Sequence, residues 1–471
     1  MNKWGFASLA LAASLSALAA PATKPLTATQ LFERAVQRRA VEAVNWGMPA
    51  VNYDLMLQEM QTKTSGKVNQ IVYWSRPLDW HNQTLTPNPD AIYLMAFFNT
   101  KDGPIVLDVP PAGADGTLNA NIVDIWQMPL EDAGPAGADE GRGGKYLILP
   151  PGYNSAIPDG YIVLRPATFG SYALMRSNLK SHGDAEVAKS VAYGKKIKVY
   201  PLSQAAAPPA TVFTDAADVM FDSTIRYDAS FFESLNRIIQ SEPWLDRDRA
   251  MIDSLRSLGI EKGKPFNPDT QTRKLLDASA KEARAWLEAR YDAGLPPFYP
   301  GSRWTMPAFP ELIEAAQAGF SAPDKYPVDI RGLTYSYAYI GIKRLGSGQF
   351  YLISIKDKAG QPFKGGHTYK LTVPANAPVE QYWSTTAYDR ETHALIRNMS
   401  RASRSSQIAE MQKNADGSVD VYFGPKAPAG KAANWVPTDP KREFEVMFRA
   451  YAPTKAFFEK QWRLSDIERI R

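Results

Sequence analysis

The 471-residue sequence contains no cysteine and only four histidines: His81, His182, His367 and His393. The absence of cysteine excludes disulfides, thiolate nucleophiles and Cys-ligated metals. No two of the histidines stand at the spacing of a transition-metal ligand pair. Hydrophobic cores must therefore hold the fold together, and a chain of this length can supply them.

Long apolar runs and basic blocks are also missing. The net charge is +5, from 54 basic and 49 acidic residues spread along the chain, which argues against a nucleic-acid partner. No apolar run reaches the ~20 residues that a membrane span requires, so we predict no membrane span. A content of 44% hydrophobic and 22% charged residues is typical of a globular protein.

Two common catalytic motifs are absent or incomplete. No Gly-x-Ser-x-Gly nucleophile elbow occurs, and the Ser177-x-x-Lys180 pattern is short enough to arise by chance, which favours a surface position. Residues 141–145, GRGGK, suggest a phosphate-binding loop. The Walker pattern fails there, because Asp139 and Tyr146 stand where Gly and Ser or Thr are needed.

Residues 1–22 have the pattern of a signal peptide. Lys3 provides the positive start, residues 4–18 are an apolar run, and Ala17-Leu18-Ala19 fits a cleavage site. We therefore predict a periplasmic or secreted protein whose mature form begins near Ala20 or Thr23.

Helical periodicity appears in two regions. Residues 23–65 form a predicted N-terminal helical segment, which begins at a capping box made by Thr27 and Gln30. Residues 214–325 form a predicted helical insert followed by a Pro-rich connector, with a helix that starts near Asp269 and stops at Gly294.

The regions at 66–213 and 326–471 are rich in short apolar runs separated by turns, which indicates two β domains. We expect strands at the following residues: 92–98, 105–109, 122–128, 146–149, 160–164, 197–202, 350–355, 369–373, 382–388, 419–423 and 444–450. Residues 172–179 are expected to form a short helix, and 332–345 fit either a strand or a helix. The whole pattern predicts a mainly β fold with helical additions.

Three long runs carry a resemblance to a known family. They are DWHNQTLTPNPDAIYLMAFF, DIWQMPLEDAGPAGADEGRGGKYLILPPGY and QYWSTTAYDRETHALI. They resemble the bacterial pairing of a domain of unknown function numbered 1254 with one numbered 1214. The resemblance implies two jelly-roll-like antiparallel β-sandwiches, and assembly as a homo-oligomer, a trimer or a multiple of three. It brings no agreed catalytic residues.

Polar residues crowd the predicted strand ends between 79 and 153, where strands would hold them rigidly. Paired carboxylates ~5–9.5 Å apart hydrolyse glycosides. The catalytic candidates are therefore Asp90, Asp124 and Asp132. Asp124 and Trp126 are two apart in a predicted strand, so both should point to one face and offer a sugar a carboxylate and a stacking platform. The tryptophans fit the core of the sandwich at least equally well.

The ligand-binding candidates are polar and aromatic residues near the same strand ends, together with one C-terminal pair. They are Trp80, His81, Asn88, Trp126, Gln127, Arg142 and Lys145, and Asn434 with Trp435. Calcium is the one cofactor we consider, through Asp124, Glu131, Asp132, Asp139 and Glu140. Solvated loop acids paired with Arg142 and Lys145 are the favoured alternative.

The sequence thus leaves two functions open. The first is a non-catalytic envelope protein that binds a glycan or another small ligand and assembles into rings. The second is a carbohydrate-active hydrolase or lyase that uses paired carboxylates.

Overall fold

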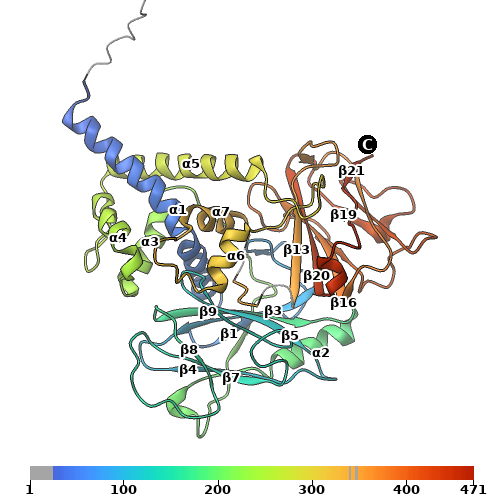
Figure 1. The fold of residues 1–471 in the computed structure, drawn as a ribbon, viewed down its shortest axis with the longest axis horizontal. Helices are drawn as coiled ribbons and strands as arrows, with labels where there is room; N and C mark the ends of the chain where they lie inside the picture. Colours follow the sequence, from blue (N-terminus) through green and yellow to red (C-terminus); the bar gives the residue numbers. More distant parts are fainter. Residues whose placement is uncertain (1–24, 339–340, 345–347, 471) are drawn as a thin grey trace, which may run out of the picture.

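A computed structural model of the protein describes residues 25–338, 341–344 and 348–470. Figure 1 shows two β-rich halves and a layer of helices. The N-terminal β domain lies at the bottom of the view and the C-terminal β domain at the upper right, with the helices above the N-terminal domain. The mainly β fold with helical additions is confirmed.

The N-terminal domain is a sandwich of two sheets. The larger sheet has the order β11-β1-β3-β9-β5-β6, and the smaller one the order β10-β4-β7-β8. Neighbouring strands are antiparallel except for β1 with β11 and β7 with β8. The strands are β1 Ile71–Tyr73, β3 Ala91–Asn99, β4 Ile105–Val109, β5 Leu118–Asp124, β6 Pro129–Ala133, β7 Gly144–Ile148, β8 Ile162–Leu164, β9 Gly170–Asn178, β10 Lys198–Pro201 and β11 Phe213–Asp215. A small parallel pair joins β2 Asn82–Gln83 to β12 Phe221–Asp222.

Both faces of the six-stranded sheet are buried. Along β3, Tyr93, Met95 and Phe97 belong to the core shared with the helices. The alternate residues Leu94, Ala96 and Phe98 pack toward the four-stranded sheet. Because side chains alternate along a strand, this sheet forms the middle of three layers.

The short helix predicted at residues 172–179 is wrong. These residues form β9, which lies between β3 and β5 in the middle of the sheet. Tyr172 and Leu174 face the helices, and Ala173 and Met175 face the other sheet. A strand that is buried on both faces shows no polar alternation, so its sequence resembles that of a buried helix. The strand predicted over 122–128 is also interrupted, because β5 ends at Asp124 and a tight turn follows.

The C-terminal domain is a second sandwich. One sheet has the order β13-β20-β16-β17, with β14 also paired to β20, and the other has the order β19-β18-β15-β21. The strands are β13 Gln349–Ser354, β14 Phe363–Lys364, β15 Tyr369–Val373, β16 Val379–Asp389, β17 Ser403–Ser405, β18 Val419–Gly424, β19 Trp435–Pro437, β20 Glu443–Pro453 and β21 Glu468–Arg469.

The two faces of strand β20 are buried in different surroundings. Phe444, Val446, Phe448 and Ala450 fill the core of the C-terminal sandwich. The alternate residues Glu445, Met447, Arg449 and Tyr451 are also buried. They point away from that core, toward the helices and the N-terminal domain. A charged residue in a buried strand requires a partner, and the partners of Glu445 and Arg449 define the sites described below.

The helical layer is built around α1 (Ala28–Lys63), whose predicted capping box between Thr27 and Gln30 is present. Packed against it are α3 Ser230–Ser241, α5 Thr270–Ala293 and α7 Val328–Tyr337. The layer also contains α4 Arg249–Ser254 and α6 Pro310–Gln317. Asp269 caps α5 through the backbone N–H of Thr272, as its sequence predicts. The sequence left residues 332–345 open between a strand and a helix. The first part of this range is helical, because it belongs to α7. In Figure 1, α5 runs from the helical layer toward the C-terminal sandwich.

Two short helices, α2 (Asp184–Gly194) and α8 (Lys455–Phe458), complete the fold. Among the residues described, none of the helices has the length and apolar character to cross a membrane. The predicted signal peptide, residues 1–22, lies outside the described residues.

Candidate active site

The candidate active site is a cluster of a histidine, a carboxylate and a tyrosine. It lies between α5 and the loop of residues 389–395, which follows β16. At its centre, Nδ1 of His393 lies 2.9 Å from Oε1 of Glu445, and the hydroxyl of Tyr291 donates a 2.8 Å hydrogen bond to Oε2. Glu445 is fully buried, and the His393 side chain is 9% exposed. Burial and the neighbouring Glu445 raise the pKa of Tyr291 well above its ordinary value, so Tyr291 stays a hydrogen-bond donor.

A nearby cation, Arg390, helps to balance the charge of Glu445. The guanidinium of Arg390 lies 4.5 Å from the centre of that ring and forms a 2.7 Å ion pair with Asp292. Burial opposes the charge on Arg390, but Glu445 and Tyr291 outweigh it and raise the pKa of Arg390. A buried carboxylate is stable here because a hydroxyl, an imidazole and a nearby cation surround it.

The loop that carries His393 is fixed by Asp389. One carboxylate oxygen of Asp389 accepts the backbone N–H groups of Glu391 (2.9 Å) and Thr392 (3.1 Å), and Arg442 pairs with both oxygens. The backbone N–H of Asp389 donates to the carbonyl of Ala394 and closes the turn. These bonds hold the imidazole in place before any ligand arrives, which is what a catalytic side chain requires.

His393 itself has a left-handed backbone, with φ of 55°. That conformation is uncommon for a residue with a side chain and costs ~1–3 kcal/mol. The N–H of His393 donates to Asp389, and its carbonyl accepts a 2.7 Å bond from Thr86 of the N-terminal domain. Strain of this kind is concentrated at functional sites, where the surrounding structure enforces it.

His393 lines a cavity of ≈ 160 Å³, which we call the His393 cleft. Its other walls come from α5, the segment 224–227, Leu85 and Ser336. Because Nδ1 is held by Glu445, Nε2 is the ring nitrogen left for a ligand, and none of the described residues hydrogen-bonds it. The pair has the geometry of a general base in which a carboxylate orients a histidine.

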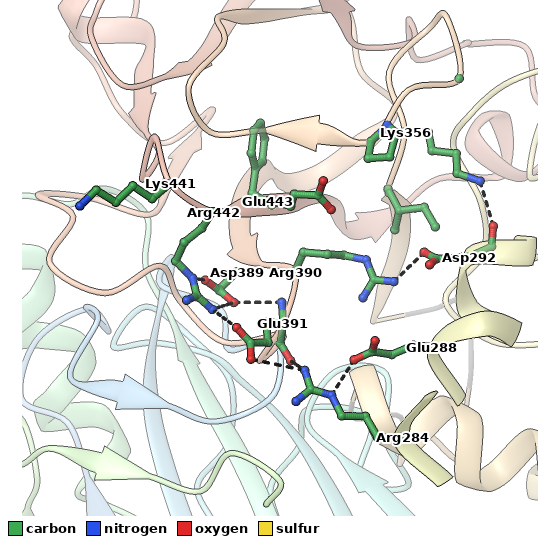
Figure 2. A pocket seen from close by; sticks show the side chains of 14 residues that line it. Arg284, Glu288, Asp292, Lys356, Asp389, Arg390, Glu391, Lys441, Arg442 and Glu443 are labelled. Carbon is green, nitrogen blue, oxygen red and sulfur yellow. Dashed lines mark hydrogen bonds and ion pairs between the residues drawn. The ribbon is translucent and has the colours of Figure 1, made fainter. Parts of the chain in front are cut away.

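A larger, open groove of ≈ 630 Å³ adjoins the cleft, and Arg284, Glu288 and Glu391 line both. This charged groove contains five basic and five acidic residues (Arg284, Lys356, Arg390, Lys441 and Arg442; Glu288, Asp292, Asp389, Glu391 and Glu443). Figure 2 shows Arg284, Arg390 and Arg442 each joined to a carboxylate. Of the described residues that line it, only Phe444 is aromatic, and Phe444 is 1% exposed. The groove therefore offers hydrogen bonds and charge, with no platform for stacking a sugar.

Comparison with known proteins places the cleft within a family. Residues 68–201 match the model of a protein of unknown function (DUF1254), and residues 348–455 match that of a protein of unknown function (DUF1214). The chain belongs to this DUF1254–DUF1214 pairing. The pairing stated by resemblance is thus confirmed. His393 and Glu445 both lie in the DUF1214 part, whereas α5 lies between the two matched segments.

No curated protein matches the sequence of this DUF1254–DUF1214 protein. Among solved structures, the VPA0106 protein from Vibrio parahaemolyticus is similar, with a TM-score of 0.56 and 16% identity, over 93% of this chain and 100% of the other. A putative uncharacterized protein from Burkholderia cenocepacia has a TM-score of 0.40 and 12% identity, over 93% and 95% of the two chains. The first similarity supports the fold alone.

The acids predicted from sequence as one catalytic group are not brought together. Asp90 precedes Ala91, which pairs with Asn178 at one end of β9, whereas Asp124 pairs with Ser171 at the other end. Seven residues of strand separate these ends, about 23 Å at ~3.3 Å per residue. This distance exceeds the widest spacing of a glycosidase pair, so Asp90 and Asp124 cannot act as one.

Asp124 and Trp126 do not lie on one exposed face either. Asp124 accepts the backbone N–H groups of Trp126 (2.8 Å) and Met128 (3.0 Å), and so it shapes the turn after β5. Trp126 is 3% exposed and packs on Trp46, with ring centres 4.6 Å apart. Gln127 is buried against α1, where it donates to Pro49 and Asn52. The expected sugar platform is wrong, and Trp126 belongs to the core.

Asp90 lies at the interface of the two domains. Its Oδ1 accepts a 3.0 Å bond from Ser403 and lies 3.2 Å from Nε2 of His182. Burial lowers the pKa of His182, but the contact with Asp90 outweighs burial and raises it. The side-chain amide of Asn88 donates to the hydroxyls of Tyr382 and Tyr451 in the C-terminal domain. The Pro87–Asp90 motif therefore joins the two domains.

The remaining candidates are dispersed. Asp132 accepts bonds from Asn121 and from the backbone of Arg344, and burial raises its pKa. Trp80 stacks on His81, and Arg142 and Lys145 are exposed. Asn434 is bonded to Gln412 and Asp420 inside the C-terminal domain, and the Trp435 indole donates to Gly424. Among the described residues, no three acids or histidines converge as metal ligands, so the acids proposed for calcium do not form one site.

Proposed function

We propose that this DUF1254–DUF1214 protein is an acid–base enzyme that acts on a small polar substrate in the His393 cleft. The observation that carries the proposal is the 2.9 Å contact between Nδ1 of His393, which lines the cleft, and the fully buried Glu445. Packing alone requires neither the buried carboxylate partner of His393 nor its strained backbone, so both features point to function.

The arrangement supports proton abstraction from a water or a substrate hydroxyl. Glu445 holds the tautomer with its proton on Nδ1, which leaves the Nε2 lone pair to accept a proton. The imidazolium that forms is stabilised by Glu445, to which Tyr291 donates throughout. Arg284, on the wall of both the cleft and the charged groove, is the cation placed to interact with negative charge that develops on the substrate.

The two connected cavities also limit the substrate. The His393 cleft, at ≈ 160 Å³, accommodates a small reacting group, and the ≈ 630 Å³ groove accommodates the rest of the molecule. Equal numbers of acids and bases in the groove favour a polar or zwitterionic molecule over a strongly charged one.

Binding of a glycan or another small ligand without turnover is the second candidate, and the open, polar form of the charged groove favours it. Export and assembly as a trimer or a multiple of three stay predictions from the sequence and the resemblance.

A panel of esters, amides, lactones, glycosides and phosphoesters, with products detected by mass spectrometry, tests the proposal. Loss of a general base lowers kcat/KM by about 10²–10⁴-fold, so we expect that loss in His393→Gln. His81→Gln is the matched control, because His81 is a partly exposed histidine paired with Asp79. Turnover that survives His393→Gln contradicts the proposal, and a ligand bound in the cleft without turnover selects the second candidate.

A further inference from the structure

A separate, smaller cavity lies between the two sandwiches and is lined by two arginines. It has a volume of ≈ 30 Å³, and its lining includes Arg176, Arg449, Tyr93, Tyr172 and Tyr351. Arg176 is 5% exposed and Arg449 is 1% exposed. We call it the arginine cavity.

Strand alternation places both guanidinium groups there. On β9, Arg176 follows Tyr172 and Leu174 on the face turned away from the four-stranded sheet. On β20, Arg449 follows Glu445 and Met447 on the face turned away from the C-terminal core. Each arginine thus lies on a strand paired on both sides within its sheet, and the two sheets direct them into the same interface.

Neither guanidinium has an acidic partner among the described residues. Arg176 donates to the side-chain oxygen of Asn121 (2.8 Å) and lies over the ring of Tyr93. Arg449 donates to Thr386 (3.0 Å), to the carbonyl of Thr86 (2.8 Å) and to the hydroxyl of Tyr388. The Nε atom of each arginine is buried and has no hydrogen-bond partner in the part of the chain that the structure describes.

Two like charges at one buried cavity without a counter-charge are unfavourable on two counts. Each cation loses its hydration, and the two repel one another where water cannot screen them. Tyrosine rings attract cations only through their quadrupoles, which do not neutralise a charge. The acid nearest to Arg176 in the hydrogen-bond network, Asp132, is reached only through the amide of Asn121.

We propose that the arginine cavity binds a small monovalent anion of the size of chloride or formate. A cavity needs ~10–15 Å³ to hold one water, so ≈ 30 Å³ admits an anion of two or three heavy atoms and excludes phosphate. The anion accepts hydrogen bonds from the free Nε groups and joins the two domains electrostatically. This site is separate from the His393 cleft, although Leu85 lines both cavities.

Bromide is the probe that tests this inference. We expect crystals of the wild-type chain grown in bromide to show an anomalous peak between Arg176 and Arg449. We also expect added bromide to raise the Tm of the wild type by about 2 °C or more, because a ligand that binds only the folded state stabilises it.

Two variants separate specific from general salt effects. Arg449→Met removes one guanidinium at similar length and is expected to abolish the bromide-specific Tm rise, whereas Arg38→Met, at an exposed position on α1, keeps it. A cavity that holds only water in bromide crystals overturns the proposal, and so does an equal bromide effect in wild type and Arg449→Met. If Arg449→Met does not fold, the wild-type crystal decides. None of these results depends on catalysis at His393.

Discussion

The imidazole of His393 and the carboxylate of Glu445 are 2.9 Å apart, although 52 positions separate them in the chain. The contact arises because Glu445 on β20 pairs with Tyr388 on β16, and the loop after β16 returns His393 to the same face. The pair therefore depends on two features, the turn at residues 389–395 and the register between β16 and β20. The segments 389–395 and 443–453 are therefore the parts of the molecule where substitutions should affect function most.

The first prediction concerns the support of the loop. Asp389→Ala removes the acceptor for two backbone N–H groups and the partner of Arg442. We expect unfolding in urea to require about 1–3 kcal/mol less free energy, together with a fall in activity on any substrate found. Asp102→Ala, the same change at an exposed position that lines neither the cleft nor the groove, is the control. Wild-type stability in Asp389→Ala would show that the loop does not depend on this carboxylate.

The second prediction concerns pH. The pKa of His182 is raised in the folded protein by its contact with Asp90, which outweighs the effect of burial. The contribution of this pair to stability is therefore complete below the ordinary histidine pKa of about 6.5 and is lost as the pH rises through the folded pKa. Urea unfolding over a pH series should show this fall in the wild type.

In Asp90→Asn and in His182→Gln the corresponding fall should be absent, since each removes one member of the pair. An unchanged pH dependence in both variants contradicts the assignment of Asp90 as the partner that raises the pKa of His182.

The third prediction tests whether Trp126 is a core residue or a platform for a ligand. Trp126→Ala leaves Trp46 without its packing partner and should cost ~3–5 kcal/mol of unfolding free energy. Trp244→Ala, at a position that is 41% exposed, should change it by less than about 0.5 kcal/mol. A Trp126→Ala variant of normal stability that has lost affinity for a glycan is the opposite result, and it would restore the sugar platform.

Local signals in the sequence were sufficient for much of the fold. The capping box at Thr27, the cap at Asp269 and the alternating strands of the C-terminal half depend on neighbours in the chain, and the structure contains them. Strand β9 was missed because both of its faces are buried, so its periodicity carries no information about a surface. Its position between β3 and β5 depends on contacts distant in sequence.

The candidate site was harder to predict for the same reason. The density of polar residues between 79 and 153 drew attention to Asp90, Asp124 and Asp132, which serve a domain interface, a turn and a strand contact. A useful signal was nevertheless present, because Glu445 and Arg449 interrupt the apolar strand over 444–450. Charged residues inside a buried strand need specific partners. The partners of Glu445 line the His393 cleft, and Arg449 lines the arginine cavity.

The most direct test of the account is a double-mutant cycle on kcat/KM with His393→Gln, Glu445→Gln and the double variant, using the substrate found in the panel. Residues that act as one unit give non-additive losses. We therefore expect the double variant to be no slower than His393→Gln alone, with all three folded by circular dichroism. If the losses of the two single variants multiply in the double variant, or if Glu445→Gln keeps wild-type kcat/KM, then His393 and Glu445 are not a catalytic pair.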